Sequence, residues 1–352
     1  MRQSIVIAIC MGVGCGMFPM LVCAQDLLVS GRFNHSVIRY DGQSGDFIEV
    51  FAEGGGLINA IGMDFDPDGH LYVASGDLPL VNRYDGQTGV FINSFIFDDP
   101  KTKIDETGGL AGARGLVFGA DDNLYVSSGI SDQVLRYDGS TGQFMGVFAQ
   151  GDGLDGPIGL AFGSDGDLYV ASALSDMVIR YNGSTGQFVE QFVDTGDGGL
   201  NNPTGLLFGA DGHLYVASAI TNQVLLYDGQ SGDFIDVFAS GNMSVPIGIT
   251  FGPKGDFYVA SFQTDSVIKY DGISGHFLEV FATGGGLDGS HFMLFGPNIG
   301  DLNGDGSVSV SDLLILFSNW GSCDTCIDCP ADLDDNCTVS TNDLLILFAN
   351  WG

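Results

Sequence analysis

The side chains best suited to binding chemistry lie near the C-terminus, where a short segment rich in Asp, Asn, Ser and Thr occurs twice, 31 residues apart. In both copies oxygen-bearing side chains stand at positions 1, 3, 5, 9 and 12 of a twelve-residue loop, with an apolar residue at position 8. Calcium takes six to eight oxygen ligands, and loops of this pattern supply them, with position 7 giving its backbone carbonyl. The sequence therefore predicts two calcium ions as cofactors. Their ligands are Asp301, Asn303, Asp305, Ser307, Ser309 and Asp312 in the first loop, and Asp332, Asp334, Asn336, Thr338, Ser340 and Asp343 in the second.

Each loop is followed by the same apolar run, Asp-Leu-Leu-Ile-Leu-Phe-x-Asn-Trp-Gly, which predicts a short helix ended by a glycine. These helices are expected over residues 312–320 and 343–351. No helix is expected to enter either loop, because Pro297 precedes the first and Pro330 the second. Each half is therefore a loop with an exit helix only. A solvated acidic tail is the alternative, but it does not account for a duplicated loop and helix.

Four cysteines lie in the same region, Cys323, Cys326, Cys329 and Cys337, and the other three belong to an apolar N-terminal run. An even, local set of cysteines in an exported chain predicts two disulfides, whose connectivity the sequence leaves open. The alternative is a zinc site of four thiolates, since Cys323 and Cys326 have the spacing of zinc ligands. An oxidising compartment favours the disulfides, because thiols pair there.

The tandem of loop and exit helix resembles a dockerin, and specifically the cysteine-containing dockerins at the C-termini of exported planctomycete proteins. The resemblance covers residues 300–352. It implies that residues 297–352 form a calcium-binding module, which anchors the protein through a cohesin-like partner or a cell-surface component. Two positions depart from the EF-hand loop: Cys337 replaces the turn glycine at position 6, and position 12 is Asp rather than Glu, as in dockerins generally.

Residues 25–296 are organised by a repeat. The run Leu-Tyr-Val-Ala-Ser at residues 71–75 recurs at Leu168 and Leu214, with Ser in place of Ala in the copy at Leu124 and Phe in place of Leu in the copy at Phe257, while a divergent first copy begins at Leu27. A period of about 45 residues is typical of a solenoid or a propeller. Within each repeat, four short runs alternate apolar and polar residues and are separated by turns containing Gly and Asp. Four strands per repeat predict a propeller blade.

The order of the strands predicts how the ring closes. The chain after residue 24 begins with a second strand, over residues 27–31, and the region ends with a first strand, over residues 291–296, that has no partner in its own repeat. Together these two strands complete one blade. We therefore expect an all-β, six-bladed propeller latched by its termini, followed by the small helical calcium module. Closure removes free sheet edges that would otherwise template aggregation.

The Gly-x-Leu-Tyr-Val-Ala-Ser runs and the Pro-x-Gly strands before them resemble NHL-repeat propellers and the related streptogramin (virginiamycin B) lyase family. Propellers of this kind include scaffolds, ligand binders and enzymes, so the resemblance implies the fold more than the activity. Lyases of that family are expected to use His and Glu near the channel mouth, and a gluconolactonase-like propeller a Glu, Asn and Asp metal site at the axis. The first strands of this chain offer no Glu. Its only glutamates are Glu49, Glu53, Glu106, Glu190 and Glu279.

One position of the innermost strands is irregular, the one just before the strand glycine. The six blades carry there Ile61, Arg114, Ile158, Thr204, Ile247 and His291. If these side chains point into the channel, Arg114, Thr204 and His291 converge on a small anionic or polar ligand, with Arg114 as a bidentate donor and His291 as a titratable one. Drift among the repeats at a wet channel mouth is the alternative.

The N-terminus indicates export. Arg2 precedes an uncharged apolar run that ends at the small residue Ala24, which is typical of a cleaved signal peptide over residues 1–24. A retained membrane anchor is the alternative, but the glycines and Pro19 within the run disfavour a spanning helix. No later segment is long and apolar enough to span a membrane. We expect a secreted protein, extracellular or attached to the cell surface.

The charge balance excludes one class of partner. The chain has 11 Lys and Arg against 44 Asp and Glu, a net charge of −33. Nucleic acid is excluded, because its phosphates must be neutralised by basic side chains. Two functions remain. The first is an exported, non-catalytic propeller that binds a small molecule, a sugar, a peptide or a protein and is anchored through its dockerin. The alternative is a streptogramin lyase-like or carbohydrate-active enzyme delivered by the same module. The lack of an acid and base pair at the predicted axis favours the first.

Overall fold

The computed structural model describes residues 25–98, 106–296, 300, 302, 308–323, 329, 331–333 and 336–349. The chain divides into two compact units, the larger from Ala24 to Pro297 and the smaller comprising the C-terminal residues from Asn298. The predicted signal peptide, residues 99–105 and much of both predicted calcium loops lie outside the described residues. No helix of the described residues has the length and apolar character needed to cross a membrane.

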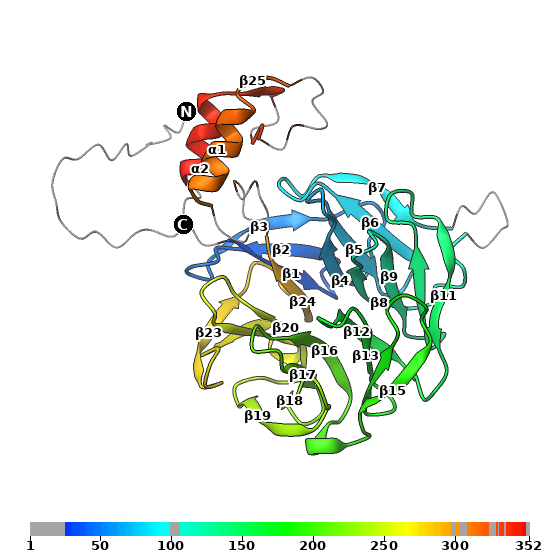
Figure 1. Ribbon diagram of the computed structural model, residues 1–352. Coiled ribbons are helices and arrows are strands. Elements are labelled where there is room, and N and C mark those ends of the chain that lie inside the picture. Colours follow the sequence, from blue (N-terminus) through cyan, green and yellow to red (C-terminus); the bar gives the residue numbers. More distant parts are fainter. Residues whose placement is uncertain are drawn as a thin grey trace. The chain divides into compact units, whose positions relative to one another are not determined.

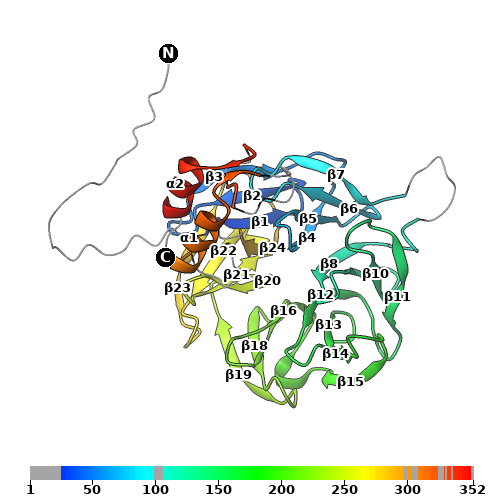
Figure 2. The same ribbon diagram turned by 45° about the horizontal axis from the view of Figure 1, so that its top comes forward.

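The larger unit is a ring of six four-stranded antiparallel sheets, as predicted (Figures 1 and 2). From the innermost strand outward, the first three blades are β24 (Ser290–Phe295), β1 (Leu27–Gly31), β2 (Ser36–Tyr40) and β3 (Phe47–Ala52); β4 (Ala60–Phe65), β5 (Leu71–Ser75), β6 (Leu80–Tyr84) and β7 (Phe91–Ile96); and β8 (Ala113–Phe118), β9 (Leu124–Ser128), β10 (Gln133–Tyr137) and β11 (Phe144–Gln150). The other three are β12 (Pro157–Phe162), β13 (Leu168–Ser172), β14 (Met177–Tyr181) and β15 (Phe188–Val193); β16 (Pro203–Phe208), β17 (Leu214–Ser218), β18 (Gln223–Tyr227) and β19 (Phe234–Ser240); and β20 (Pro246–Phe251), β21 (Phe257–Ser261), β22 (Ser266–Tyr270) and β23 (Phe277–Thr283).

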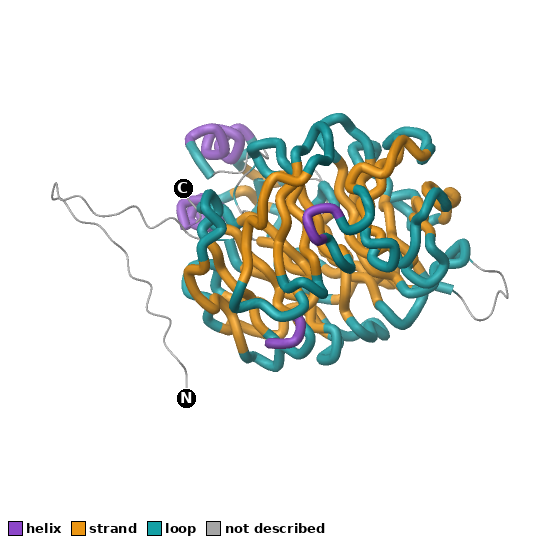
Figure 3. Tube along the Cα trace, turned by 90° about the horizontal axis from the view of Figure 1, so that it is seen from below, coloured by secondary structure: helices purple, strands orange, loops and turns teal. Residues whose placement is uncertain are grey.

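The termini of the ring close it in the predicted way. Strand β1 pairs with β24, the last strand of the unit, with Leu27 opposite Phe295 and Leu28 opposite Leu294. Figure 3 shows the strands of the ring joined by loops and turns, with two short helical segments among them. Among the described residues of this unit, the helical turns are η1 (Asp197–Gly199) and η2 (Phe262–Thr264).

The tyrosine of the repeated Leu-Tyr-Val-Ala-Ser run joins neighbouring blades. Tyr169 is buried with its ring edge-on to Phe192 of its own blade and to Phe208 of the next, with both ring centroids at 4.8 Å. Its hydroxyl donates to Asp165 at 3.0 Å. Equivalent tyrosines in four other blades lie between phenylalanine rings in the same way. Edge-to-face pairs of this kind stabilise a core beyond the area they bury.

A second tyrosine, at the end of each third strand, fixes the loop that enters its blade. Tyr227 donates to the carbonyl of Asp197 at 2.8 Å, and Tyr40 donates to the carbonyl of Gly284 at 2.8 Å. The contact of Tyr40 spans 244 residues of sequence, so it also helps to close the ring. The eleven tyrosines of the chain are all used in these two positions.

The smaller unit holds two helices of nine residues, α1 (Val310–Ser318) and α2 (Thr341–Ala349), and a short ladder of β25 (Gly321–Ser322) with β26 (Thr338–Val339). Both helices begin two residues earlier than predicted, and α1 also ends two residues earlier. The early start of α1 comes from a capping box: Ser309 accepts from the backbone N–H of Ser311, and the Asp312 carboxylate accepts from the N–H of Ser309. Asp312 therefore lies at the third helical position instead of the first.

Candidate functional site

The innermost strands approach one another so closely that only glycine fits at one position in most blades. A Cβ on Gly159 would collide with the carbonyl of Thr204 in the next blade, and one on Gly115 with the carbonyl of Ile158. Gly62, Gly205 and Gly248 are in the same situation. This contact explains the strand glycine of the repeat. It also brings the residue before each glycine close to the axis of the ring.

The predicted channel residues line a common cavity. Arg114, Thr204 and His291 all border a space of about 300 Å³ near the start of the innermost strands. Two other blades contribute apolar side chains to the wall from the same repeat position, Ile158 between Arg114 and Thr204 and Ile247 between Thr204 and His291 in the order of the blades. The irregular position of the repeat therefore defines a mixed polar and apolar cavity.

Thr204 lines this cavity, but its hydroxyl is already engaged. The side chain is 1% exposed, and Oγ1 donates to the carbonyl of Pro246 at 2.9 Å. That hydrogen bond ties β16 to β20 of the next blade. Of the three predicted residues, Thr204 is thus the one whose polar group serves the scaffold.

His291 is a second deeply buried polar residue of the cavity wall. It is 4% exposed, and its Nδ1 has no hydrogen-bond partner. Its ring is perpendicular to that of Phe262 at 6.1 Å between centroids. Burial, with the positive charges of Arg32 and Arg114 nearby, lowers the pKa of His291 to about 3. The imidazole is therefore neutral at physiological pH and offers one donor and one acceptor.

Arg32 is the residue that the sequence analysis missed. It follows β1, at the position where four of the other blades have Gly76, Gly129, Ala173 and Ala219. Arg32 lines the cavity, and its Nε is buried without a hydrogen-bond partner. An alignment of the repeats at the position after the Leu-Tyr-Val-Ala-Ser run would have revealed an arginine in place of a small residue.

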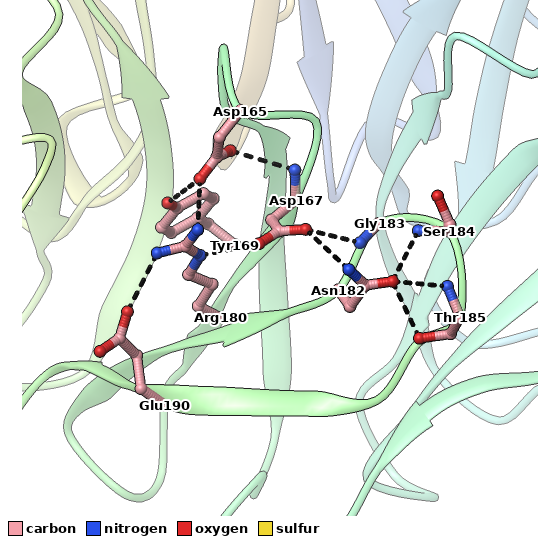
Figure 4. A network of polar contacts seen from close by, with 9 residues as sticks. All are labelled: Asp165, Asp167, Tyr169, Arg180, Asn182, Gly183, Ser184, Thr185 and Glu190. Carbon is pink, nitrogen blue, oxygen red and sulfur yellow. Dashed lines mark hydrogen bonds and ion pairs between the residues drawn. The ribbon is translucent and has the colours of Figure 1, made fainter.

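The cavity does not fit a metal ion of the gluconolactonase kind. Among the described residues, its lining contains two arginines and no carboxylate. A divalent cation needs anionic oxygen ligands, and two guanidinium groups repel it. The glutamates of the outer strands are elsewhere: Glu190 pairs with Arg180 at 3.1 Å, and Arg180 also contacts Asp165 and Asp167 (Figure 4). Glu49 and Glu279 face Arg39 and Lys269 in the same way.

A second, smaller cavity of about 200 Å³ lies further along the same strands, and Asp64 is its one ionisable lining residue. The Asp64 carboxylate accepts from the N–H groups of Phe65 and Phe118, at 2.9 Å each. Burial raises the pKa of Asp64 to about 6, even though these two hydrogen bonds act to lower it. No general acid or base partner lines this cavity with it.

The structure describes seven of the twelve predicted calcium ligands: Ser309, Asp312, Asp332, Asn336, Thr338, Ser340 and Asp343. Asp301, Asn303, Asp305, Ser307 and Asp334 lie outside the described residues. Asp312 and Asp343 are fully buried at equivalent places, and each carboxylate accepts from two backbone N–H groups, one at the start of its loop and one at its end. Asp332 is 6% exposed and accepts from Asn336 and Cys337.

The three described cysteines of the smaller unit are all in disulfides. Cys323 forms a disulfide with Cys329, and Cys337 is also disulfide-bonded, while Cys326 lies outside the described residues. Sulfurs in a disulfide are not thiolates, so this arrangement is incompatible with a zinc site of four thiolates. Cys337 has a φ of 67°, the left-handed conformation that glycine usually adopts at position 6 of such loops.

The fold and the cavity define a six-bladed propeller with a cationic cavity among its innermost strands. A family model described as the SMP-30/Gluconolactonase/LRE-like region matches residues 35–263, which is more than half of the chain. The protein belongs to this family. No curated protein matches the sequence.

Two solved structures show the same fold. One is a chain of the nidogen/laminin complex, with a TM-score of 0.62 and 18% identity over 78% of this chain and 98% of that one. The other is selenomethionine-substituted virginiamycin B lyase from Staphylococcus aureus, with a TM-score of 0.51 and 16% identity over 66% and 73% of the two chains. The predicted likeness to virginiamycin B lyase is thus confirmed for the fold. Neither likeness carries information about activity at this level of identity.

Proposed function

We propose that this protein is an exported, non-catalytic propeller that binds a ligand in the cavity at Arg114 and His291. The observation that carries the proposal is the composition of that cavity. It has buried polar atoms without partners, which a ligand would satisfy, but it has no carboxylate to pair with His291 as acid and base. The low pKa of His291 also makes it a poor proton acceptor at neutral pH.

An enzyme of the lyase or lactonase kind is the second candidate, and membership of the SMP-30/gluconolactonase family is the observation that favours it. A lactonase needs a group that activates water, either a bound metal or a general base. The described cavity wall supplies neither a carboxylate nor a histidine that is basic near neutral pH. Binding without turnover is therefore the stronger candidate.

One experiment tests both candidates. The full-length protein is screened by ligand-observed NMR against lactones, sugars and small acids, and each positive mixture is followed for product formation. Leu174 lines the cavity and is 68% exposed, so Leu174→Trp can fill the mouth without disturbing the core. We expect ligands that bind the wild type, are lost with Leu174→Trp and are not converted. Binding that persists in Leu174→Trp contradicts the proposed site, and steady conversion contradicts the non-catalytic role.

We further propose that the smaller unit is a calcium-dependent dockerin that anchors the propeller to a cohesin-like protein or another cell-surface component. Three buried or nearly buried carboxylates, Asp312, Asp332 and Asp343, support a cation there, because the chain has no Lys or Arg after Lys269 to balance them. Calcium would be held by the twelve predicted loop residues. The ion would supply a positive charge that fixes both loops.

Exposed apolar side chains on and next to the two helices support a docking role. Phe317 on α1 is 49% exposed, Trp320, two residues after α1, is 45% exposed, and Leu345 on α2 is 66% exposed. The test compares the full chain with a chain ending at residue 297, both expressed in the native host with and without calcium. We expect the full chain to stay with the cells only when calcium is present, and the shortened chain to be released. Equal release of both excludes an anchoring role.

A further inference from the structure

The distribution of basic side chains makes the cavity exceptional in this acidic chain. The described residues contain eight Lys and Arg, of which five stand on third strands of the blades: Arg39, Arg83, Arg136, Arg180 and Lys269. Each of these five lies over an aromatic ring, and three of them also pair with carboxylates. Two of the other three, Arg32 and Arg114, line the cavity.

Neither cavity arginine forms an ion pair with a described residue. No ion pair involves Arg32 or Arg114 in that part of the chain, and the Nε of Arg32 is buried without a hydrogen bond. Burial and the charge of Arg32 both lower the pKa of Arg114, and Asp77 opposes this effect. Asp77, however, accepts from Asn59 at 2.6 Å and does not line the cavity. Two neighbouring guanidinium groups that form no ion pair are a costly arrangement unless an anion joins them.

The remaining wall limits the kind of anion. Leu174, Phe262 and Ile247 line the same cavity. In four blades, the loop after the second strand carries an exposed apolar side chain at the same repeat position: Phe33, Ile130, Leu174 and Ile220. A simple inorganic anion would leave this apolar wall without a partner. A volume of about 300 Å³ is at the small end of ligand pockets, so it suits a small molecule.

We propose that the cavity binds a small organic acid, with its carboxylate held by Arg32 and Arg114 and its apolar body against Leu174 and Phe262. This inference rests on the proposed function, because it names the class of ligand for the same site. The neutral imidazole of His291 donates one hydrogen bond to the carboxylate from its unpartnered Nδ1. An arginine fork suits a carboxylate because it presents two parallel N–H donors.

The test uses the full-length, calcium-loaded protein with phenylacetate and hexanoate, their uncharged amides phenylacetamide and hexanamide, and inorganic sulfate. Affinities are measured by calorimetry, and the arginine Nε–Hε signals are followed by NMR. We expect at least one acid to bind roughly tenfold or more tightly than its amide and than sulfate, because hydrogen bonds to a charged group are the stronger ones. Only the signals of Arg32 and Arg114 should shift.

Matched variants assign the binding to the cavity. Arg114→Gln and Arg32→Gln should each lower the affinity for the organic acid by roughly tenfold or more, whereas Arg136→Gln, on a third strand, should change this affinity by less than about twofold. Amides that bind as well as acids would overturn the anionic class but leave a ligand cavity in place. If sulfate bound as tightly as the acids, the proposed role of the apolar wall would be overturned. Failure of every acid to bind would overturn the inference, and unchanged affinity in both cavity variants would do the same.

Discussion

In the propeller, five of the six blades place a buried tyrosine ring against phenylalanines of their own and the next blade. The buried core of the C-terminal unit, as far as its residues are described, consists instead of six small or medium side chains, Val308, Leu316, Ala331, Leu333, Val339 and Leu347. The propeller pairs several of its surface charges, as around Arg180, but the smaller unit has buried carboxylates and no basic residue. The side chains of the ring thus provide the core and the charge pairs that its folding needs. The smaller unit depends on disulfides and, by our proposal, on calcium, because a core of this size contributes little alone.

The largest expected effect is the removal of calcium. Both tryptophans, Trp320 and Trp351, belong to the smaller unit, and all eleven tyrosines belong to the propeller, so two optical signals separate the units. With EGTA, we expect the tryptophan-detected melting transition to fall by more than about 10 °C or to vanish, since a bound ion at 100 times its Kd contributes about 2.7 kcal/mol per site. The transition seen by tyrosine near-ultraviolet circular dichroism should move by less than about 2 °C.

The same experiment has a matched pair of variants. Asp332→Asn should reproduce the effect of EGTA in part, because it removes one anionic oxygen from the second loop. Asp233→Asn, in an exposed turn of the propeller, should leave both transitions in place. Tryptophan and tyrosine signals that shift together on chelation would show that the two units do not unfold independently.

The next effect is on the packing between blades. Tyr169→Ala removes a buried ring from contact with Phe192 and Phe208, and we expect the free energy of unfolding of the propeller to fall by about 3–5 kcal/mol. Tyr169→Phe keeps the ring and loses only the hydrogen bond to Asp165, at a cost of about 1 kcal/mol. Urea unfolding followed by circular dichroism measures both. An equal cost for the two variants would mean that the hydroxyl, not the ring, joins the blades.

A third prediction concerns the pH dependence of stability, to which Asp64 and His291 contribute with opposite signs. The folded-state pKa of Asp64 is raised to about 6, so the folded protein binds more protons than the unfolded one between about pH 4 and 6, and Asp64 makes stability fall as pH rises there. The pKa of His291 is lowered to about 3, so the unfolded protein binds more protons in the same window, and His291 makes stability rise with pH.

The two contributions should nearly cancel in the wild type between pH 4 and 6. Relative to it, Asp64→Asn should show a stability that rises with pH, by up to about 1.4 kcal/mol per pH unit, and His291→Gln one that falls by a similar slope. Urea unfolding at several pH values gives these slopes, which do not depend on the baseline cost of either variant. Identical slopes in all three proteins would contradict the assignment of these two pKa shifts.

Much of the propeller could be predicted from the sequence, because each blade repeats the same local signals. The Leu-Tyr-Val-Ala-Ser runs fixed the number of blades, and the unpaired strands at 27–31 and 291–296 predicted the latch that β1 and β24 form. The helix bounds of the smaller unit were less accurate. Ser309 and Asp312 could serve either as calcium ligands or as a capping box, and the sequence alone does not decide between two roles for the same oxygens.

The sequence predicted only part of the candidate site, and there is a physical reason why the rest was not recognised. Arg114, Thr204 and His291 stand out because they differ from Ile at one repeat position, and the structure brings all three to one cavity. Arg32 comes from a different repeat position and was not recognised. Its proximity to Arg114 depends on the radius of the ring, which a repeat pattern does not contain. The burial of His291, which leaves its Nδ1 without a hydrogen-bond partner, likewise depends on the closed ring and cannot be read from the repeat pattern.

The smallest effect is expected at the charges that are exposed on the outer face of the propeller. Glu190 pairs with Arg180 at 3.1 Å, but its side chain is 49% exposed, and exposed pairs contribute about 0–1 kcal/mol because water and salt screen them. We expect Glu190→Gln to change the free energy of unfolding by less than about 1 kcal/mol, and by nothing measurable in 1 M salt. Arg180 keeps two other carboxylates, Asp165 and Asp167, so it does not become an unpaired charge. Urea unfolding at low and high salt measures the difference. A loss that matched Tyr169→Ala would mean that the outer ion pairs, and not the rings between blades, hold the propeller together.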